Sequence, residues 1–257
     1  MTLSFTKYQG TGNDFIIIDD PTGELKQKAL AWVPTLCQRR LGIGADGLIL
    51  ISPCQNTDFE VVYFNSDGSQ SFCGNGARCA VHFAHAKGYF VKDTTFSAID
   101  GVHEAFIEGD EVHLAMQDVS GFELKGEDYI VHTGSPHYIR FDELKGYNIV
   151  DFGRKIRFSD EFRKDGINVN IAEQQEDELI MCTYERGVED ETLSCGTGAT
   201  AVALAWALEI GETKAINQTI QVKGGKLRVT AVRNGDAFNN IWLIGPAKPV
   251  FQGEVNV

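Results

Sequence analysis

The sequence predicts two similar α/β lobes, each of which wraps β-sheet around one buried helix. The first observation is an internal echo: residues 73–77 read Cys-Gly-Asn-Gly-Ala and residues 195–199 read Cys-Gly-Thr-Gly-Ala, about half the chain later. The second is that each block leads into an alanine-rich apolar stretch, and the third is that strand-like runs surround both stretches. A repeat on this scale indicates a repeated structural unit.

The two alanine-rich stretches predict helices of about three turns. The first covers residues 77–87 and stops at Gly88, and the second covers residues 199–209 and stops near Gly211. A glycine commonly follows the last turn of a helix. Because both stretches are apolar on every side, the helices are expected to be buried.

Short apolar runs predict the strands, and two weaker patterns predict further helices. A helix near Leu25–Arg40 is expected to be kinked or broken by Pro34, and another is expected near Phe158–Asp165. The lobes are expected to join near residues 117–128, and a pseudo-twofold arrangement would place the two cysteine turns face to face across a cleft. The strand-like runs are Phe15–Ile18, Leu48–Ile51, Phe59–Phe64, Val112–Met116, Ile130–Val131, Glu178–Thr183, Thr219–Val222, Leu227–Val232 and Ile241–Ile244.

Composition excludes several classes of protein. The 257 residues are 43% hydrophobic and carry a formal net charge of -13, which disfavours nucleic acid and anionic membrane as partners. Residues 1–10 show no secretory signal and no run is apolar enough to span a membrane, so a cytoplasmic protein is expected. In that compartment the six cysteines remain thiols, and the absence of any Cys-x-x-Cys pair disfavours zinc-ribbon and thioredoxin-like functions.

The two Cys-Gly-x-Gly turns predict acid–base chemistry. A cysteine at a helix N-terminus lies near unpaired N–H groups and the positive end of the helix dipole, and both favour the thiolate. The N–H groups of Gly74, Asn75, Gly196 and Thr197 could hold a carboxylate. A matched pair suits a nearly symmetric reaction, in which one group removes a proton from one face of a carbon and the other delivers a proton to the opposite face. Racemisation or epimerisation of an amino acid, with Cys73 and Cys195 as the acid–base pair and without a cofactor, is therefore expected.

Several motifs, in order and almost over the full length, resemble the diaminopimelate epimerase family. The order and spacing of these motifs together are far more specific than any one of them. They are Gly10-Thr11-Gly12-Asn13-Asp14-Phe15, Gly42-Ile43-Gly44-Ala45-Asp46-Gly47, Phe64-Asn65-Ser66-Asp67-Gly68-Ser69, Cys73-Gly74-Asn75-Gly76-Ala77-Arg78-Cys79, Gly134-Ser135-Pro136-His137, Asn168-Val169-Asn170, and Tyr184-Glu185-Arg186-Gly187 leading to Cys195-Gly196-Thr197-Gly198.

The resemblance implies an α+β fold of two pseudo-twofold lobes, each a mixed β-sheet closing around a central buried helix. The first lobe would comprise residues 1–118, with residues 246–257 returning to it, and the second residues 119–245. The implied activity is pyridoxal-independent conversion of LL-2,6-diaminopimelate to the meso form, for lysine synthesis and, in many bacteria, peptidoglycan. The implied assembly is a homodimer.

The resemblance also implies roles for individual residues. Cys73 and Cys195 match the paired base and acid, and His137 and Glu185 match residues that tune them. Arg186 matches an arginine that binds the distal carboxylate with its planar fork. The substrate-binding set is Asn13, Gly47, Asn65, Gly74, Asn75, Ser135, Asn168, Glu185, Arg186, Gly196 and Thr197, and no metal ligand is expected. Gly47 and Ser135 depart from the glutamine and asparagine of many relatives, so contacts to the far end of the substrate are expected to differ.

The sequence alone leaves three alternatives open. The first is a proline or hydroxyproline racemase, against which Asn75 and Arg186 argue. The second is a binding or redox-sensing protein that uses the cysteine pair as a disulfide switch. The third is a zinc site formed by residues on one helix and its turn, namely Cys73, Cys79, His82 and His85.

Overall fold

The chain folds into two compact units. A computed structural model describes residues 1–257, and it divides them into a first unit of Met1–Leu114 with Gly245–Val257 and a second unit of Ala115–Ile244. The stretch 117–128, expected at the junction, contains a strand of the second unit, β8 (Phe122–Lys125). The first unit is therefore discontinuous in sequence, whereas the second is a single segment.

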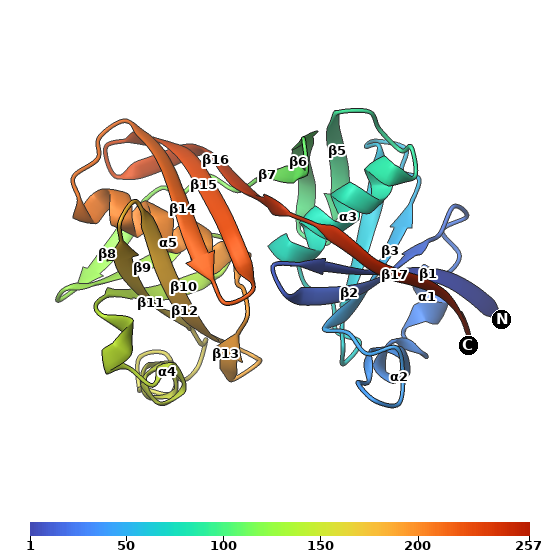
Figure 1. Cartoon of the computed structure of the whole chain (residues 1–257), viewed down its shortest axis with the longest axis horizontal. Helices are drawn as coiled ribbons and strands as arrows, with labels where there is room; N and C mark the ends of the chain where they lie inside the picture. The colour runs from blue at the N-terminus through green and yellow to red at the C-terminus, as the bar shows by residue number, and fades with distance from the viewer. The chain divides into compact units, whose positions relative to one another are not determined.

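The first unit is built on a mixed sheet in the order β17-β1-β2-β3-β4-β5-β6-β7. The pairs β2–β3 and β4–β5 are parallel, and the other neighbours are antiparallel. Figure 1 shows β17, in red, running alongside β1, in dark blue. The strands are β1 (Thr2–Gly10), β2 (Asn13–Asp19), β3 (Gly47–Ser52), β4 (Phe59–Asn65), β5 (Asp93–Ala98), β6 (Gly101–Glu108), β7 (Glu111–Ala115) and β17 (Lys248–Asn256).

The buried helix α3 (Gly74–Ala86) packs against one face of this sheet. Successive residues of a strand point to opposite faces, so each strand directs alternate residues towards the helix. A Cβ on Gly76 of α3 would contact Phe15 and Ile49, so these residues face the helix. Leu48 and Leu50 belong instead to a cluster on the opposite face, which the short helices α1 (Lys26–Ala29) and α2 (Val33–Cys37) cover. The sheet is thus buried on both faces in this region.

The second unit has a mixed sheet in the order β8-β9-β10-β11-β12-β14-β15-β16, with β13 paired to β12. Its apolar core surrounds α5 (Gly196–Glu209), whose residues from Ala199 to Ala205 are fully buried. The remaining elements are β9 (Asp128–His132), β10 (Pro136–Phe141), η1 (Leu144–Gly146), α4 (Ile149–Arg157), β11 (Asn168–Gln175), β12 (Glu178–Glu185), β13 (Asp190–Thr192), β14 (Ala215–Val222), β15 (Gly225–Asn234) and β16 (Ala237–Pro246).

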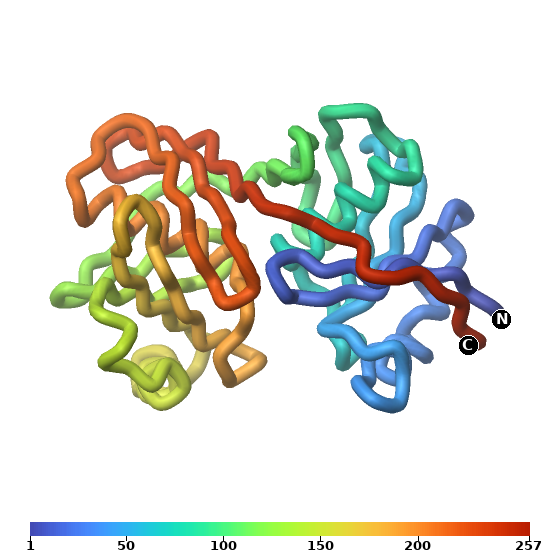
Figure 2. The backbone as a smooth tube through the Cα atoms, in the orientation of Figure 1, coloured from blue at the N-terminus to red at the C-terminus, as the bar shows by residue number.

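The two units repeat one topology. In both, the successive strand pairs are antiparallel, antiparallel, parallel, antiparallel, parallel, antiparallel and antiparallel. The buried helix follows the fifth strand in the order, β4 in one unit and β12 in the other, and the C-terminal strand β17 takes the place that β8 has in the second unit. In Figure 2 the tube can be followed into the C-terminal residues, drawn in red, which belong to the first unit from Gly245 onwards. The predicted fold class, two similar lobes of mixed sheet around a helix, is confirmed.

The predicted helices have different outcomes. Both alanine-rich helices are present, and Leu25–Arg40 is broken as expected, with Pro34 in the first turn of α2. The prediction of a helix at Phe158–Asp165 is wrong, because these residues form turns after α4. Arg157 Nη1 donates hydrogen bonds to the backbone carbonyls of Phe162 and Arg163 in these turns. No helix in the structure has the length and apolar character required to span a membrane.

Candidate active site

Cys73 and Cys195 occupy the same position in their units. Each is the residue immediately before the buried helix, with φ −133° and ψ 114° at Cys73 and φ −128° and ψ 111° at Cys195. In each case the first intrahelical bond returns to the cysteine carbonyl, from Ala77 N at 2.8 Å and from Ala199 N at 2.9 Å. The amide N–H groups that precede this bond have no carbonyl partner within the helix, so both cysteines lie at the electropositive end of a helix.

In the first unit, Asn13 links Cys73 to the start of α3. Asn13 is the first residue of β2, and its Oδ1 lies 3.5 Å from Cys73 Sγ and accepts from Asn75 Nδ2 at 3.3 Å. Its Nδ2 donates to Asp46 Oδ2 at 2.6 Å. The carboxylate can only accept, so it fixes which end of the Asn13 amide faces the cysteine.

A buried arginine donates hydrogen bonds to the same turn. Arg78 is 0% exposed, and its guanidinium donates to Asn75 Oδ1 at 3.0 Å, Gly74 O at 3.3 Å and Thr11 Oγ1 at 3.4 Å. Burial lowers the pKa of Arg78 from its ordinary value. The buried Arg78 guanidinium therefore lies within hydrogen-bond distance of Gly74 and Asn75 in the Cys-Gly-Asn-Gly turn.

A charged cluster holds Asp46 in place. Arg39 binds Asp14 in a bidentate manner, at 3.1 and 2.7 Å, and reaches Asp46 Oδ1 at 2.8 Å. Buried Lys7 forms an ion pair with Asp14 at 2.7 Å and also donates to the carbonyl of Gly44. Burial raises the pKa of Asp14, but the hydrogen bonds from Arg39 and Lys7 outweigh it and hold the pKa at about 2.

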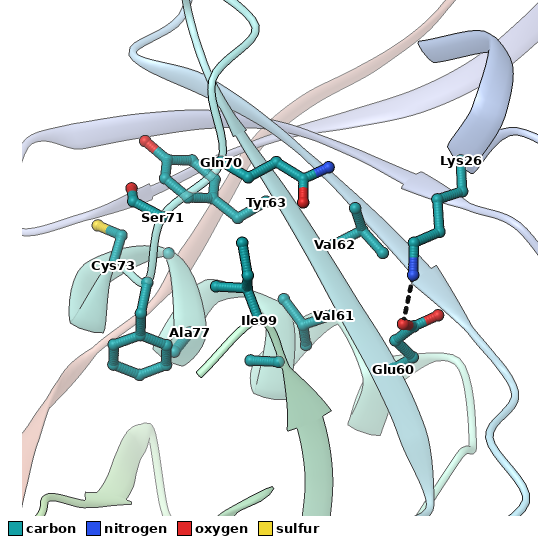
Figure 3. A pocket seen from close by; sticks show the side chains of 13 residues that line it. Lys26, Glu60, Val61, Val62, Tyr63, Gln70, Ser71, Cys73, Ala77 and Ile99 are labelled. Carbon is teal, nitrogen blue, oxygen red and sulfur yellow. Dashed lines mark hydrogen bonds and ion pairs between the residues drawn. The ribbon is translucent and has the colours of Figure 1, made fainter. Parts of the chain in front are cut away.

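A small cavity of about 100 Å³ lies beside Cys73, between β4 and the segment 70–73 (Figure 3). Tyr63 lines it, with Cys73 and Ser71 nearby, and at its far end Lys26 pairs with Glu60 at 2.7 Å. Gly47 lies under the Tyr63 ring: a Cβ there would be 2.3 Å from Tyr63 Cε2. The Tyr63 ring thus fills the space that a side chain at position 47 would need.

Asn65 lies opposite Gly47 in the β3–β4 register and is engaged within its own turn. Its Nδ2 donates to Ser69 Oγ at 3.0 Å, and its Oδ1 accepts from Ser71 Oγ at 3.3 Å. In this structure the Asn65 amide therefore organises the loop that leads to Cys73.

In the second unit, a chain of hydrogen bonds leads to Cys195. Its Sγ lies 3.5 Å from Thr197 Oγ1, and this hydroxyl lies 3.0 Å from His137 Nε2. On the other side of the ring, Asn170 Nδ2 lies 3.2 Å from His137 Nδ1, and Thr183 Oγ1 donates to Asn170 Oδ1 at 2.9 Å. Burial lowers the pKa of the His137 imidazole to about 3, with His132 and Arg186 adding to the shift, so the ring is neutral at physiological pH.

A second group in this unit surrounds Asn168. Its Nδ2 donates to Ser135 Oγ at 2.9 Å, and its Oδ1 accepts from the Arg186 backbone N at 2.9 Å. The exposed Arg186 guanidinium donates to Asp165 O at 2.8 Å and to Ser135 Oγ at 3.4 Å. Gly166, at φ +74°, permits this placement, since a Cβ there would lie 2.4 Å from Arg186 Cδ. Asn168, Ser135 and Arg186 thus form one cluster.

The sequence matches a known family over most of its length. The family model described as diaminopimelate epimerase matches residues 5–119 and 129–250. The chain belongs to the diaminopimelate epimerase family. Diaminopimelate epimerase of Flavobacterium psychrophilum is 48% identical over 254 residues, covering 97% of this chain and 99% of the relative. That of Aquifex aeolicus is 37% identical over 276 residues, covering 99% and 98%.

Solved structures with much lower identity share the fold. A phenazine biosynthesis protein of the PhzF family from Bacillus anthracis superposes with a TM-score of 0.80 at 14% identity, covering 100% of both chains. A hydroxyproline epimerase from Agrobacterium vitis superposes with a TM-score of 0.71 at 14% identity, covering 99% of this chain and 91% of that one. At this identity the likeness concerns the fold alone.

The motif residues form two local groups, one in each unit of the family fold. Asn13, Asn75 and Cys73 meet in the first, and Ser135, His137, Asn168, Arg186, Thr197 and Cys195 lie in connected clusters in the second. Glu185 ends β12 and lies opposite Asp190 of β13. For the zinc alternative, no three His, Cys, Asp or Glu side chains group as metal ligands, and His82 Nδ1 is bonded to Tyr8.

The sequence alone does not single out several residues that connect these clusters. Asp46 and Asn170 lie within the family-like motifs, but the motifs alone indicate no role for them. The period of two in a strand places residues 168 and 170 on the same face, and this signal could have identified Asn170. Thr183 carries no motif, and only the β11–β12 register, which sets it opposite Asn170, reveals it.

Proposed function

We propose that this protein converts LL-2,6-diaminopimelate to meso-diaminopimelate, in lysine biosynthesis and in the supply of a peptidoglycan precursor. The observation that carries the proposal is the placement of Cys73 and Cys195 at topologically equivalent helix N-termini, with nearly equal backbone angles. Membership of the diaminopimelate epimerase family, over both halves of the chain, supports the same activity. The enzyme is an amino-acid epimerase of the isomerase class.

In the proposed reaction, Cys73 and Cys195 act on opposite faces of one α-carbon. The thiolate of one cysteine takes the α-proton and becomes a thiol, and the thiol of the other gives its proton to the opposite face of the carbanion and becomes a thiolate. One turnover thus exchanges the protonation states of the two cysteines, and the reverse reaction restores them. No redox step or covalent intermediate with a cofactor is required by this balance.

The two helix N-termini are proposed to bind the α-carboxylate. The N–H groups of Gly74 and Asn75, and those of Gly196 and Thr197, lie at these ends, where backbone donors and the helix dipole favour an anion. Negative charge spreads into the carboxylate when the α-proton leaves, so donors fixed in advance stabilise the transition state more than the ground state.

The far end of the substrate is proposed to bind the Arg186 cluster. The Arg186 guanidinium is exposed and held by Asp165 O and Ser135 Oγ, so its fork is oriented before substrate arrives. Asn13, Gly47, Asn65, Asn168 and Glu185 complete the proposed contacts. Gly47 has no side chain, so its proposed contact is made through the backbone. His137 and Glu185 are proposed to tune the cysteines.

Solvent deuterium incorporation tests the mechanism. Wild-type protein in D2O is expected to produce meso-diaminopimelate with deuterium at the inverted carbon. Cys73→Ala and Cys195→Ala are each expected to abolish epimerisation. Cys54→Ala is expected to retain it, because Cys54 lies at neither helix N-terminus and its Sγ contacts the Ser97 hydroxyl. Wild-type epimerisation by either active-site variant would refute the two-cysteine mechanism.

L-Proline as substrate separates this proposal from the racemase alternative. Family membership and Arg186, which suits a substrate with a second carboxylate, favour diaminopimelate. We therefore expect no racemisation of L-proline. Turnover of proline without exchange of the diaminopimelate α-hydrogen would overturn the substrate assignment.

We propose further that the protein acts in the cytoplasm as a homodimer, without cofactor, nucleic acid or membrane. The net charge of -13 argues against phosphate-rich partners. Exposed apolar side chains on β17, Val250 at 56% and Phe251 at 49% exposure, support association with a second copy. Sedimentation analysis is expected to give twice the mass of the chain, and a monomer at micromolar concentration would contradict the assembly.

A further inference from the structure

His137 is enclosed between an amide and a hydroxyl. The side chain is 0% exposed, with Asn170 Nδ2 3.2 Å from Nδ1 and Thr197 Oγ1 3.0 Å from Nε2. A neutral imidazole carries hydrogen on one nitrogen only, so these two neighbours decide between the tautomers.

The orientation of the Asn170 amide is set by two other partners. The backbone carbonyl of Tyr138 can only accept, and it lies 3.1 Å from Asn170 Nδ2. On the opposite side, Thr183 Oγ1 donates to Asn170 Oδ1 at 2.9 Å. The amide nitrogen must therefore face His137, where its second hydrogen points at Nδ1. Because Nδ1 accepts this hydrogen bond, the proton of the neutral ring resides on Nε2.

The tautomer sets the direction of the next hydrogen bond. His137 Nε2–H donates to Thr197 Oγ1, so the hydroxyl hydrogen of Thr197 is left to point at Cys195 Sγ, 3.5 Å away. Asn168 Nδ2 also lies near Nε2, but at 3.5 Å, and it donates to Ser135 Oγ at the shorter distance of 2.9 Å. A hydroxyl that donates to sulfur stabilises the thiolate.

The first unit shows that the fold does not require this polar chain. The strands β2 and β3 of the first unit correspond to β10 and β11 of the second. Phe15 of β2 pairs with Gly47 of β3, and His137 of β10 pairs with Asn168 of β11, so Phe15 corresponds to His137. Two residues further along, Ile49 of β3 corresponds to Asn170 of β11. Ile49 pairs with Tyr63 of β4, and Asn170 pairs with Thr183 of β12.

The same positions of the topology are thus filled by Phe15, Ile49 and Tyr63 in one unit and by His137, Asn170 and Thr183 in the other. Phe15 and Tyr63 pack edge to face, with ring centroids 5.8 Å apart. Burying polar groups costs free energy unless every one is bonded, so an apolar set is the simpler way to fill this space. The polar set of the second unit therefore serves something other than packing.

We propose that Asn170 is a positioning residue that holds His137 with its hydrogen on Nε2 and thereby directs the Thr197 hydroxyl at the Cys195 sulfur. The proposal deepens the two-cysteine mechanism and rests on it for its catalytic consequence. Asn170 itself touches neither substrate nor sulfur in this scheme. Thr183 has a supporting part, because it fixes the amide that fixes the ring.

Nitrogen-15 NMR of histidine-labelled protein tests the tautomer without any substrate. The His137 signals are assigned by comparison with His137→Gln. In the wild type at pH 7 we expect a protonated Nε2 and an unprotonated Nδ1. Asn170→Asp presents a carboxylate that can only accept, so we expect the Nδ1 of His137 to become protonated. A wild-type ring with hydrogen on Nδ1 alone, or Asn170→Asp spectra identical to wild type, would overturn the proposal.

Kinetics supply the second arm. In Asn170→Asp we expect kcat to fall at least about tenfold, with little change in KM and with a shifted pH dependence of kcat. Thr183→Val, which has the shape of threonine without its hydroxyl, is expected to show a smaller loss, and Thr183→Ser is expected to restore wild-type kcat. Equal values of kcat and equal pH profiles in wild type and Asn170→Asp would refute the role of Asn170.

The two arms separate the two proposals. If the wild type has the expected tautomer but does not epimerise diaminopimelate, the proposed function fails and the structural assignment of His137 stands. If the wild type epimerises diaminopimelate but Asn170→Asp alters neither the ring nor kcat, the function stands and the positioning role fails.

Discussion

Asn13 Nδ2 donates to Asp46 Oδ2 over 2.6 Å, and this bond leaves Asn13 Oδ1 directed at Cys73 Sγ. Asp46→Asn would remove the obligatory acceptor and allow the Asn13 amide to turn over. Hydrogen bonds to charged groups contribute about 1.5–3 kcal/mol, so we expect kcat/KM for diaminopimelate to fall about tenfold or more.

The matched control is Arg39→Gln. It removes the ion pairs of Arg39 with Asp14 and Asp46 but retains the carboxylate that binds Asn13. Because Arg39 is largely exposed, we expect kcat/KM within about twofold of wild type. Equal losses in the two variants would show that the ion-pair cluster, and not the orientation of Asn13, is what matters.

Gly198→Ala is expected to destabilise the second unit. The added Cβ would lie 2.8 Å from Asn170 Oδ1 and 3.3 Å from Cys195 Sγ. Forcing extra volume into a packed site typically costs about 1–3 kcal/mol. Gly76→Ala, at the equivalent helix position of the first unit, places its Cβ 3.3 Å from Phe15 and 3.4 Å from Ile49 and is expected to cost less. Urea denaturation of both variants measures the difference, and a larger loss in Gly76→Ala would contradict the expectation.

Gly166→Ala is expected to impair binding of the distal carboxylate. The Cβ would lie 2.4 Å from Arg186 Cδ, so the arginine must leave its contacts with Asp165 O and Ser135 Oγ. We expect KM for diaminopimelate to rise several-fold, with a smaller effect on kcat.

Backbone strain alone is controlled by Gly126→Ala. Gly126 has φ +68°, close to the +74° of Gly166, but a Cβ there would meet nothing within 4 Å. Both variants pay the cost of a left-handed alanine, about 1 kcal/mol, yet only Gly166→Ala should alter KM. A parallel rise of KM in Gly126→Ala would assign the effect to general destabilisation.

Acid is expected to destabilise the protein through His137. Its pKa is lowered to about 3 in the folded protein, whereas an unfolded histidine has a pKa near 6.5, so the unfolded chain binds the extra proton first. Stability from this group is complete above about pH 6.5 and declines as pH falls towards 3, with a slope of up to about 1.4 kcal/mol per pH unit. Asp14, with a folded pKa of about 2, contributes in the same direction but only below about pH 4.

Free energies of unfolding between pH 7 and pH 4.5 isolate the histidine contribution. His137→Gln is expected to flatten the pH dependence in this range. The pKa of His82 is also lowered by burial, so part of the slope should persist in the variant. An unchanged slope in His137→Gln would show that His137 does not take up the proton on unfolding.

The parts predictable from the sequence are those with a strong periodic or repeated signal. The alanine-rich helices and the turns at Cys73 and Cys195 could be located because both copies carry the same pattern and a closing glycine. The sequence does not predict helix α4, which has Gly153 at its centre. Tertiary packing overrides this weak propensity: a Cβ on Gly153 would lie 2.3 Å from Tyr184 Cβ, so only glycine allows the helix to lie this close to β12.

The connections within the site were less accessible to prediction. The bond between Asn13 and Asp46 depends on two loops that meet where β2 and β3 begin. The hydrogen bonds from Thr183 to Asn170 and from Asn170 to His137 depend on the register of three strands. Motifs identified residues that could bind substrate but did not reveal how these residues hold one another. How the two cysteine turns combine on one substrate remains a prediction.

The return of β17 to the first unit delays completion of that unit's sheet during synthesis. Domains generally fold from the N-terminus as the ribosome releases them. Here the sheet that contains β1 is completed only by residues 248–256, which emerge after the whole of Ala115–Ile244. The second unit can therefore complete its folding while the edge of β1 in the first unit is still exposed. The unpaired backbone N–H and C=O groups of such an edge can pair with strands of other chains. In a nascent chain of this topology, the first unit is synthesised first but its sheet is completed last. The unpaired edge of β1 is therefore the part of the chain that needs protection from aggregation for longest.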